Sequence, residues 1–253
     1  MQYSQALEGC QPEAALKVDS WWDRAGMLLW PATCVLCLSR TDRVRDLCRP
    51  CERELVINAV RCRLCSQPLF RTSASEPICG SCLRVPTLID SSFVPFRYEY
   101  PLDRLVQRLK YGKELSVARV LGEVFAERHL ALDKPLLPDA IIPVPLGRRR
   151  YRERGFNQAH ELARCIAHGR GVALRSDLVE RVRETKEQAA LPKGQRKRNV
   201  RGAFRARGSL DGANVAIFDD VVTTGSTVHE LARILGRAGA ARIEVWAIAR
   251  AGR

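Results

Sequence analysis

Two adjacent carboxylates, followed by a run of hydroxyl side chains and one glycine, form the segment of this sequence with the clearest chemical meaning. Asp219 and Asp220 come directly after the apolar run Val215–Phe218. An apolar run of this length predicts a buried strand, so the two acids are expected at its carboxyl end, where open α/β sheets bind their ligands. The residues after the acids are Val221, Val222, Thr223, Thr224, Gly225, Ser226 and Thr227.

This composition indicates a site for a sugar phosphate. Backbone N–H groups at the start of a helix attract an anion, and the threonine and serine hydroxyls add donors. Gly225 has no Cβ and lets the chain turn close to a phosphate. Two neighbouring carboxylates repel each other unless a cation or donor lies between them, and ribose hydroxyls with Mg²⁺ meet that need. The alternative is an ordinary strand, turn and helix with an acidic edge.

Eight cysteines in four Cys-x-x-Cys pairs indicate structural zinc. All eight fall within 49 residues, and two such pairs complete a tetrahedral site with no open coordination position. Disulfides are disfavoured in a chain where we see no export signal, and redox pairs rarely occur four in series. Sequential pairing is the simplest arrangement, and an interleaved arrangement is the alternative. The expected ligands are Cys34, Cys37, Cys48, Cys51, Cys62, Cys65, Cys79 and Cys82.

Positive charge is concentrated in one part of the chain. Of the formal net charge of +14, residues 148–207 carry 18 Lys and Arg against 6 Asp and Glu, a net of +12. This concentration favours an anionic partner, either a phosphorylated small molecule or a nucleic acid, over a merely solvated face. We expect a loop after the strand at 139–146 to hold Arg148–Arg154, and Arg154 beside Gly155 is the best single phosphate ligand. Residues 184–201 lack apolar periodicity and predict a long loop.

Apolar periodicity alternates between helix and strand from about residue 96 to the end of the chain. Helices are expected near 102–109, 115–125, 156–168 and 226–238, and strands at 139–146, 215–218 and 243–249. This alternation predicts an α/β fold with a parallel sheet and helices on both faces, preceded by the small zinc module. The expected divisions are a lead-in over 1–30, the zinc module over 31–85 and the α/β domain over 86–253.

Composition and patterning exclude several classes of protein. The chain has 253 residues and is 46% hydrophobic, which allows a sizeable core. We see neither a basic and apolar leader nor an apolar run of the roughly 18 residues that a membrane span needs, so a cytoplasmic protein is expected. The P-loop pattern and the Gly-x-Gly-x-x-Gly dinucleotide pattern are both absent, which counts against those nucleotide-binding classes.

The order of these motifs resembles that of the ComF/GntX family. Four Cys-x-x-Cys pairs precede LKYGK (109–113), IIPVPLGRRRYRERGFNQAHELA (141–163), QRKRNVRGAF (195–204) and IFDDVVTTGST (217–227). The last of these is similar to the phosphoribosyl diphosphate motif of type I phosphoribosyltransferases. The resemblance spans roughly residues 30–253 and implies a type I phosphoribosyltransferase-like fold with two structural zinc ions. It also implies a link to natural competence and DNA utilisation.

The resemblance further implies roles for individual residues. Asp219 and Asp220 would bind the ribose 2′- and 3′-hydroxyls, Thr223 to Thr227 would surround the 5′-phosphate, and Arg154 would face the departing diphosphate of a substrate held with Mg²⁺. The loop containing Lys186 would close over the site, and Lys113 would line the acceptor side. Two hypotheses follow: a phosphoribosyltransferase of unknown acceptor, or a non-catalytic metabolite sensor that engages single-stranded DNA or a DNA-uptake or recombination protein.

Overall fold

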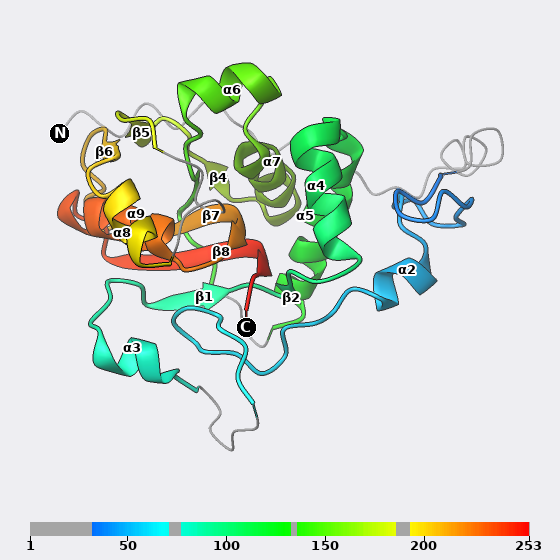
Figure 1. Cartoon of the computed structure of the whole chain (residues 1–253), viewed down its shortest axis with the longest axis horizontal. Coiled ribbons are helices and arrows are strands. Elements are labelled where there is room, and N and C mark those ends of the chain that lie inside the picture. Colours follow the sequence, from blue (N-terminus) through cyan, green and yellow to red (C-terminus); the bar gives the residue numbers. More distant parts are fainter. Residues whose placement is uncertain (1–31, 71–76, 133–135, 186–192, 253) are drawn as a thin grey trace.

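A computed structural model describes residues 32–70, 77–132, 136–185 and 193–252 of the chain (Figure 1). Within these ranges, no helix is both long and apolar enough to cross a lipid bilayer. The lead-in expected over residues 1–30 and Lys186 of the expected closing loop lie outside the described residues.

A parallel β-sheet forms the centre of the larger part of the molecule. Its strands follow the order β1-β8-β7-β3-β4, with β2 pairing farther along β8, and every pairing is parallel. This confirms the parallel sheet expected from the sequence. The strands are β1 (Ser91–Phe93), β2 (Phe96–Arg97), β3 (Ala140–Pro143), β4 (Ala173–Leu174), β7 (Asn214–Val222) and β8 (Arg242–Arg250).

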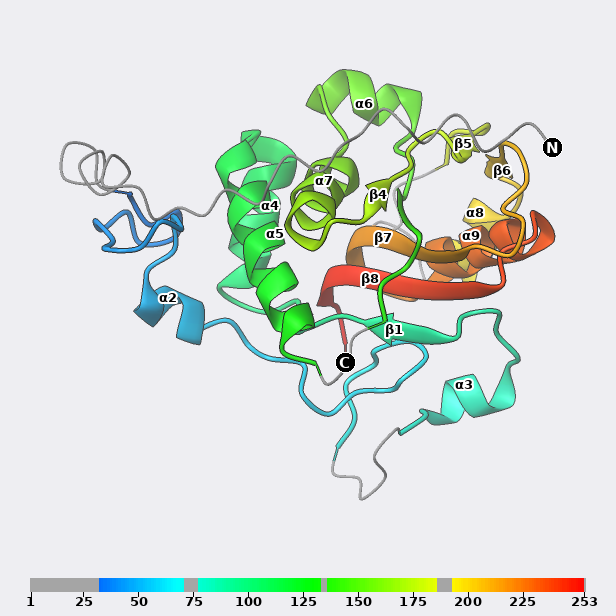
Figure 2. The same ribbon diagram turned by 180° about the vertical axis from the view of Figure 1, so that it is seen from behind.

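Helices cover both faces of this sheet, as Figures 1 and 2 show from opposite sides. Side chains alternate along β7, so Ala216 and Phe218 enter one core and Val215 and Ile217 enter the other. Because both faces are covered, the central strands are apolar at successive positions. One face carries α4 (Leu102–Gly112), α5 (Leu115–Leu130) and α7 (Gln158–Arg170); the other carries α8 (Lys193–Val200) and α9 (Ser226–Arg237).

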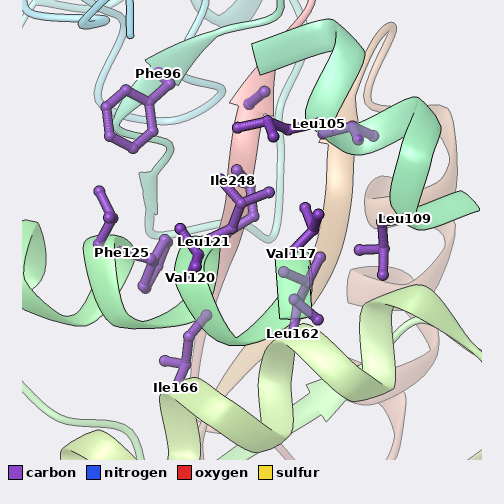
Figure 3. Close-up of a cluster of buried hydrophobic side chains, with 14 of the residues drawn as sticks. Phe96, Leu105, Leu109, Val117, Val120, Leu121, Phe125, Leu162, Ile166 and Ile248 are labelled. Carbon is purple, nitrogen blue, oxygen red and sulfur yellow. The ribbon is translucent and has the colours of Figure 1, made fainter. Parts of the chain in front are cut away.

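The larger core lies between the sheet and helices α4, α5 and α7. In Figure 3, Leu105, Phe125 and Leu162 from three different helices converge with Ile248 of β8, and all four are fully buried. Close approach of α5 to α7 depends on Gly122, because a Cβ at that position would meet the Cβ of Cys165 at 2.6 Å. The glycine is therefore required by the packing of the two helices.

We expect Gly122→Ala to destabilise the protein by about 1–2 kcal/mol, because overpacking outweighs the gain in helix propensity. Gly169→Ala in α7 is the matched control. Its new Cβ would meet Ala126 at an ordinary 3.7 Å, so this substitution should be neutral or slightly stabilising. Urea unfolding of the two variants measures the difference, and equal effects would contradict this account of the packing.

Three sequence expectations are corrected by the structure. The strand expected at 215–218 continues through both acids to Val222, because β8 supplies hydrogen-bonding partners as far as Arg250. The arginine-rich segment is a short helix, α6 (Arg148–Arg154), between Gly147 and Gly155, rather than a loop. The second half of the expected loop at 184–201 is α8, so only its first part is irregular among the described residues.

A small antiparallel pair stands apart from the main sheet. It consists of β5 (Val179–Arg181) and β6 (Phe204–Ala206), joined by the segment that contains α8. Arg181 at the end of β5 lies over the ring of Phe204, with its guanidinium carbon 5.2 Å from the ring centre. The strand pair brings Arg181 to the carboxyl end of the sheet.

His129 of α5 is a buried polar residue. Its ring centre lies 5.0 Å from that of Phe93 and 4.5 Å from that of Trp246. Burial, followed by the charge of Arg170, lowers the pKa of His129 to about 4. Strands β1 and β8, which are distant in the sequence, supply the two aromatic rings that enclose it.

The two cysteine-rich segments dock at different places on the larger part of the chain (Figures 1 and 2). The first, residues 32–58 with α2 (Arg49–Arg53), contacts α4 and α5 through Arg108, Arg119 and Arg45, which bind Val35, Asp46 and Glu127 respectively. The second, residues 59–85 with α3 (Gly80–Arg84), contacts β1 and the end of β8. Each segment therefore has its own interface.

Candidate functional site

The cysteines form two separate clusters of four. One contains Cys34, Cys37, Cys48 and Cys51 and the other contains Cys62, Cys65, Cys79 and Cys82; we call them the first and second cysteine clusters. Their sulfur atoms all lie within 4.8 Å of one another in each cluster. Each cluster therefore combines two Cys-x-x-Cys pairs that follow one another in the sequence, and the interleaved arrangement is excluded.

The geometry of both clusters fits tetrahedral zinc. The Sγ atoms of Cys37 and Cys48 are 3.7 Å apart, as are those of Cys65 and Cys79. Tetrahedral zinc with 2.3 Å bonds separates its sulfurs by about 3.8 Å. The backbone N–H of Cys79 also donates to the Sγ of Cys62 at 3.2 Å, an interaction that favours a thiolate. Both clusters suit a closed structural site and have no position for a substrate.

We expect elemental analysis to find about two zinc ions per chain, one in each cluster. Cys51→Ser and Cys82→Ser change one ligand in the first and the second cluster, respectively. Each should lower the zinc content to about one ion, since the clusters share no ligand. A wild-type content of one ion, or the loss of both ions from either variant, would contradict two independent sites.

A cavity of about 210 Å³ lies at the carboxyl end of the sheet. It is lined by every residue from Asp219 to Thr227 and by Arg154, so the structure brings these predicted residues together. The remaining walls come from α4, from the segment after β3, from the start of α7 and from β5. The lining residues that were not predicted as ligands are Tyr98, Lys110, Val144, Pro145, Leu146, Arg150, Asn157, Gln158, Ala159, Arg181 and Val228.

Lys110 of α4 forms an ion pair with Asp220 at the base of this cavity. The Asp220 side chain is 6% exposed and that of Lys110 is 19% exposed, so the pair is largely shielded from water. Asp219 lies beside it, and its Oδ1 accepts a hydrogen bond from the backbone N–H of Asp220 at 2.9 Å. One cation thus serves two adjacent acids.

The two acids differ electrostatically because Lys110 forms its ion pair with Asp220 and not with Asp219. Burial acts to raise the pKa of Asp220, but the charge and hydrogen bond of Lys110 outweigh it and the net effect is a lowered pKa. For Asp219, burial and then the Asp220 carboxylate raise the pKa well above its usual value. The surroundings therefore favour the ionised form of Asp220, whereas burial and the neighbouring charge disfavour ionisation of Asp219.

The hydroxyl loop, residues 223–227, consists of the turn after β7 and the first two residues of α9. Gly225 has a φ of 76° and serves as the N-cap of α9, and its carbonyl oxygen is 2.8 Å from Nδ1 of His229. The hydroxyls of Thr224 and Ser226 are 2.9 Å apart. The α9 face with Val228, Leu231 and Leu235 is buried against the sheet, which directs the start of the helix toward the cavity. This arrangement suits an anion.

Three arginines extend the positive lining of the cavity. Arg154 and Arg150 come from α6, and Arg181 comes from β5. The guanidinium carbon of Arg154 lies 5.3 Å from the ring centre of Tyr111 of α4. Arg181 donates to the carbonyl oxygen of Pro145 at 3.4 Å and to the hydroxyl of Thr185. Planar guanidinium groups placed in this way match phosphate oxygens.

Lys113 does not line this cavity, and the lysine that does so is Lys110, three residues earlier. Lys113 caps the end of α4 in the left-handed conformation, with a φ of 58°, and is exposed. The sequence places Lys110 four residues after Val106 and therefore beside the buried stripe of α4, but it does not show that Asp220 lies opposite. No comparable sequence pattern indicates Arg181.

Comparisons with known proteins agree with this two-part organisation. Residues 26–83 match the double zinc ribbon domain and residues 152–253 match the phosphoribosyl transferase domain. The chain is 36% identical to the DNA utilization protein YhgH of Salmonella typhimurium over 228 residues, covering 88% of this chain and 99% of that protein.

Two further relatives carry competence names. Competence protein F of Haemophilus influenzae is 31% identical, with 86% of this chain and 96% of that protein covered. Competence protein ComFC of Bacillus subtilis is 26% identical, with 88% and 86% covered. The parallel sheet, the two cysteine clusters and the similarity to these relatives all support one assignment. The chain therefore belongs to the ComF family, whose members join a double zinc ribbon to a phosphoribosyltransferase domain.

Proposed function

We propose that the cavity binds phosphoribosyl diphosphate together with Mg²⁺. The observation that carries this proposal is the meeting of three features in one cavity: the acids Asp219 and Asp220, the hydroxyl loop and Arg154. The loop and the start of α9 would hold the 5′-phosphate. The acids would accept hydrogen bonds from the two ribose hydroxyls, and the arginines would face the diphosphate. The match to the phosphoribosyl transferase domain supports the same ligand.

The acids also fit a magnesium-bearing ligand. Carboxylate oxygens are ligands that Mg²⁺ prefers, and this ion usually binds through one or two carboxylates together with substrate phosphates. Asp219 has a raised pKa, and none of the described residues gives it an ion pair like the one that Lys110 forms with Asp220. Added positive charge would therefore stabilise its ionised form. When bound, Mg²⁺ would neutralise part of the diphosphate charge.

We further propose that the site transfers ribose 5-phosphate to an acceptor. Breaking the bond between the anomeric carbon and the diphosphate leaves negative charge on the departing group. Arg154 and Arg150 on α6, with Arg181 on β5, are placed to stabilise that charge. The Asp219 carboxylate would keep the ribose oriented through its hydroxyls. We also propose that the transferase domain begins at residue 86, after the zinc module.

Arg154→Ala should weaken binding of phosphoribosyl diphosphate about 10- to 100-fold, the value of a charge-assisted hydrogen bond. Arg152→Ala is the matched control, since Arg152 belongs to the same helix but is exposed and does not line the cavity. Equilibrium binding of each variant measures the difference. Equal effects of the two substitutions would point to general electrostatic attraction by α6 and would exclude Arg154 as a specific ligand.

Diphosphate release tests the transferase step itself. The wild-type chain is incubated with phosphoribosyl diphosphate and Mg²⁺, alone and with a panel of free bases, nucleosides and single-stranded DNA. Acceptor-dependent release that is lost in Arg154→Ala supports transfer. Tight binding without release under any of these conditions supports the metabolite-sensing module instead.

The biological setting that we propose is DNA utilisation or uptake. The relatives are named for DNA utilization and competence. The exposed side of α6 with Arg148, Arg149 and Arg152, and that of α8 with Lys197 and Arg198, offer positive charge outside the cavity. Single-stranded DNA bound there would lose affinity steeply as salt increases. Undetectable or salt-insensitive binding would remove this partner.

A further inference from the structure

We propose that Arg250 is a positioning residue that couples zinc in the second cysteine cluster to the shape of the hydroxyl loop. It is the last residue of β8 and is 5% exposed. Its guanidinium group lies between the segment 65–67 of the second cluster and the end of β7. The inference concerns the resting protein, so it does not depend on which ligand the cavity binds.

The contacts of Arg250 reach both sides. In the segment 65–67, the carbonyl oxygen of Cys65 accepts a hydrogen bond from Nε of Arg250 at 3.0 Å, and Oε1 of Gln67 accepts one from Nη2 at 2.8 Å. Toward the cavity, Nη1 donates to the carbonyl oxygen of Val222 at 3.0 Å and to that of Thr223. Val222 ends β7 and Thr223 begins the hydroxyl loop. One rigid fork therefore links a zinc ligand to the first residue of that loop.

The charge of Arg250 also points to the metal. Its acceptors are carbonyl and amide oxygens, and no carboxylate is among the contacts just described. Zinc bound by four thiolates carries a net charge of about −2, which would offset a buried guanidinium. On loss of the metal the four thiolates would take up protons, and that countercharge would disappear.

The second cluster is held firmly enough to transmit this constraint. Ser92 of β1 donates its backbone N–H to the carbonyl oxygen of Arg63 at 2.7 Å, and its hydroxyl lies 2.7 Å from that of Ser66. The first cluster has a different interface, through Arg108, Arg119 and Arg45 on the side of α4 and α5. Coupling to the hydroxyl loop is therefore expected from one cluster only.

Hydrogen exchange of the zinc-loaded full chain, without ligand, tests the coupling. We expect Cys82→Ser, in the second cluster, to raise amide exchange in residues 222–227 by about tenfold or more, because the loop opens locally. Cys51→Ser, in the first cluster, should leave exchange in those residues unchanged. An unchanged loop in Cys82→Ser, or an equal rise in Cys51→Ser, would overturn the proposal.

Substitution of Arg250 separates positioning from simple stability. Arg250→Lys keeps the charge but loses the fork, so zinc content should stay near that of the wild type while exchange in 222–227 rises. Arg119→Ala, which removes a contact of the first cysteine-rich segment, is the control and should not affect the loop. If Arg250→Lys does not fold, Gln67→Ala removes one acceptor only and should produce a smaller rise. Wild-type exchange in a folded Arg250→Lys or in Gln67→Ala contradicts the proposal.

These measurements remain informative if phosphoribosyl diphosphate does not bind. Raised loop exchange with no binding in the wild type would support the coupling and reject the proposed ligand. Binding in the wild type with unchanged loop exchange in the variants would support the proposed ligand and reject the coupling.

Discussion

Asp219→Asn should lower the affinity for phosphoribosyl diphosphate by about 100-fold or more, because two charge-assisted hydrogen bonds from ribose hydroxyls would be lost or weakened. The fold should tolerate this substitution. Burial and the neighbouring Asp220 raise the pKa of Asp219 well above its usual value, so a neutral amide at this position removes a charge that the folded protein disfavours. Zinc content and the free energy of unfolding should therefore stay close to the wild-type values.

Calorimetric titration with phosphoribosyl diphosphate and Mg²⁺ measures this effect. Asp177→Asn provides the control, because that carboxylate is exposed, pairs with Arg175 and does not line the cavity. The control should bind like the wild type. Wild-type affinity in Asp219→Asn would show that the carboxylate does not contact the ligand.

Lys110→Met should destabilise the protein by about 3–5 kcal/mol at neutral pH, because it leaves the Asp220 carboxylate buried without its cation. Asp220→Asn alone should also be costly, since it leaves Lys110 unpaired. The double variant Lys110→Met with Asp220→Asn removes both charges and should recover a large part of the loss. Urea unfolding of the three variants forms a double-mutant cycle that isolates the pair.

The pH dependence of these variants has a definite sign. In the wild type, Lys110 lowers the pKa of Asp220, so its contribution to stability is present above the unfolded value near 3.8 and is lost as the pH falls through the lowered folded value. In Lys110→Met the buried Asp220 carboxyl should have a raised pKa, so its protonation at lower pH should stabilise the folded variant. The difference in free energy of unfolding between the wild type and Lys110→Met should therefore become smaller as the pH falls from 7 toward 4. A gap independent of pH would exclude the charge pair as its cause.

The sequence was informative where chemistry and structure share a local pattern. The acids and the hydroxyl loop are adjacent in the chain, and the strand and helix around them have strong apolar periodicity, so their placement in one cavity followed from the order of residues. The paired cysteines were equally local. The cap of α7 is local as well, since the side chain of Asn157 accepts a hydrogen bond from the backbone N–H of Ala159.

Expectations failed where short polar helices or distant contacts decide the structure. Helix α6 has no buried residue, so apolar periodicity could not separate it from a loop. The burial of His129 depends on Phe93 and Trp246, and the role of Lys110 depends on the packing of α4 beside the end of β7. These contacts join segments that are far apart in the sequence, and a local pattern does not carry them.

Titration of the zinc-loaded wild-type chain with phosphoribosyl diphosphate in the presence of Mg²⁺ tests the central claim most directly. We predict saturable binding of one molecule per chain, weakened when ribose 5-phosphate or diphosphate is added, because each occupies part of the same cavity. The absence of saturable binding, or binding that neither fragment affects, would contradict a phosphoribosyl diphosphate site at the end of β7.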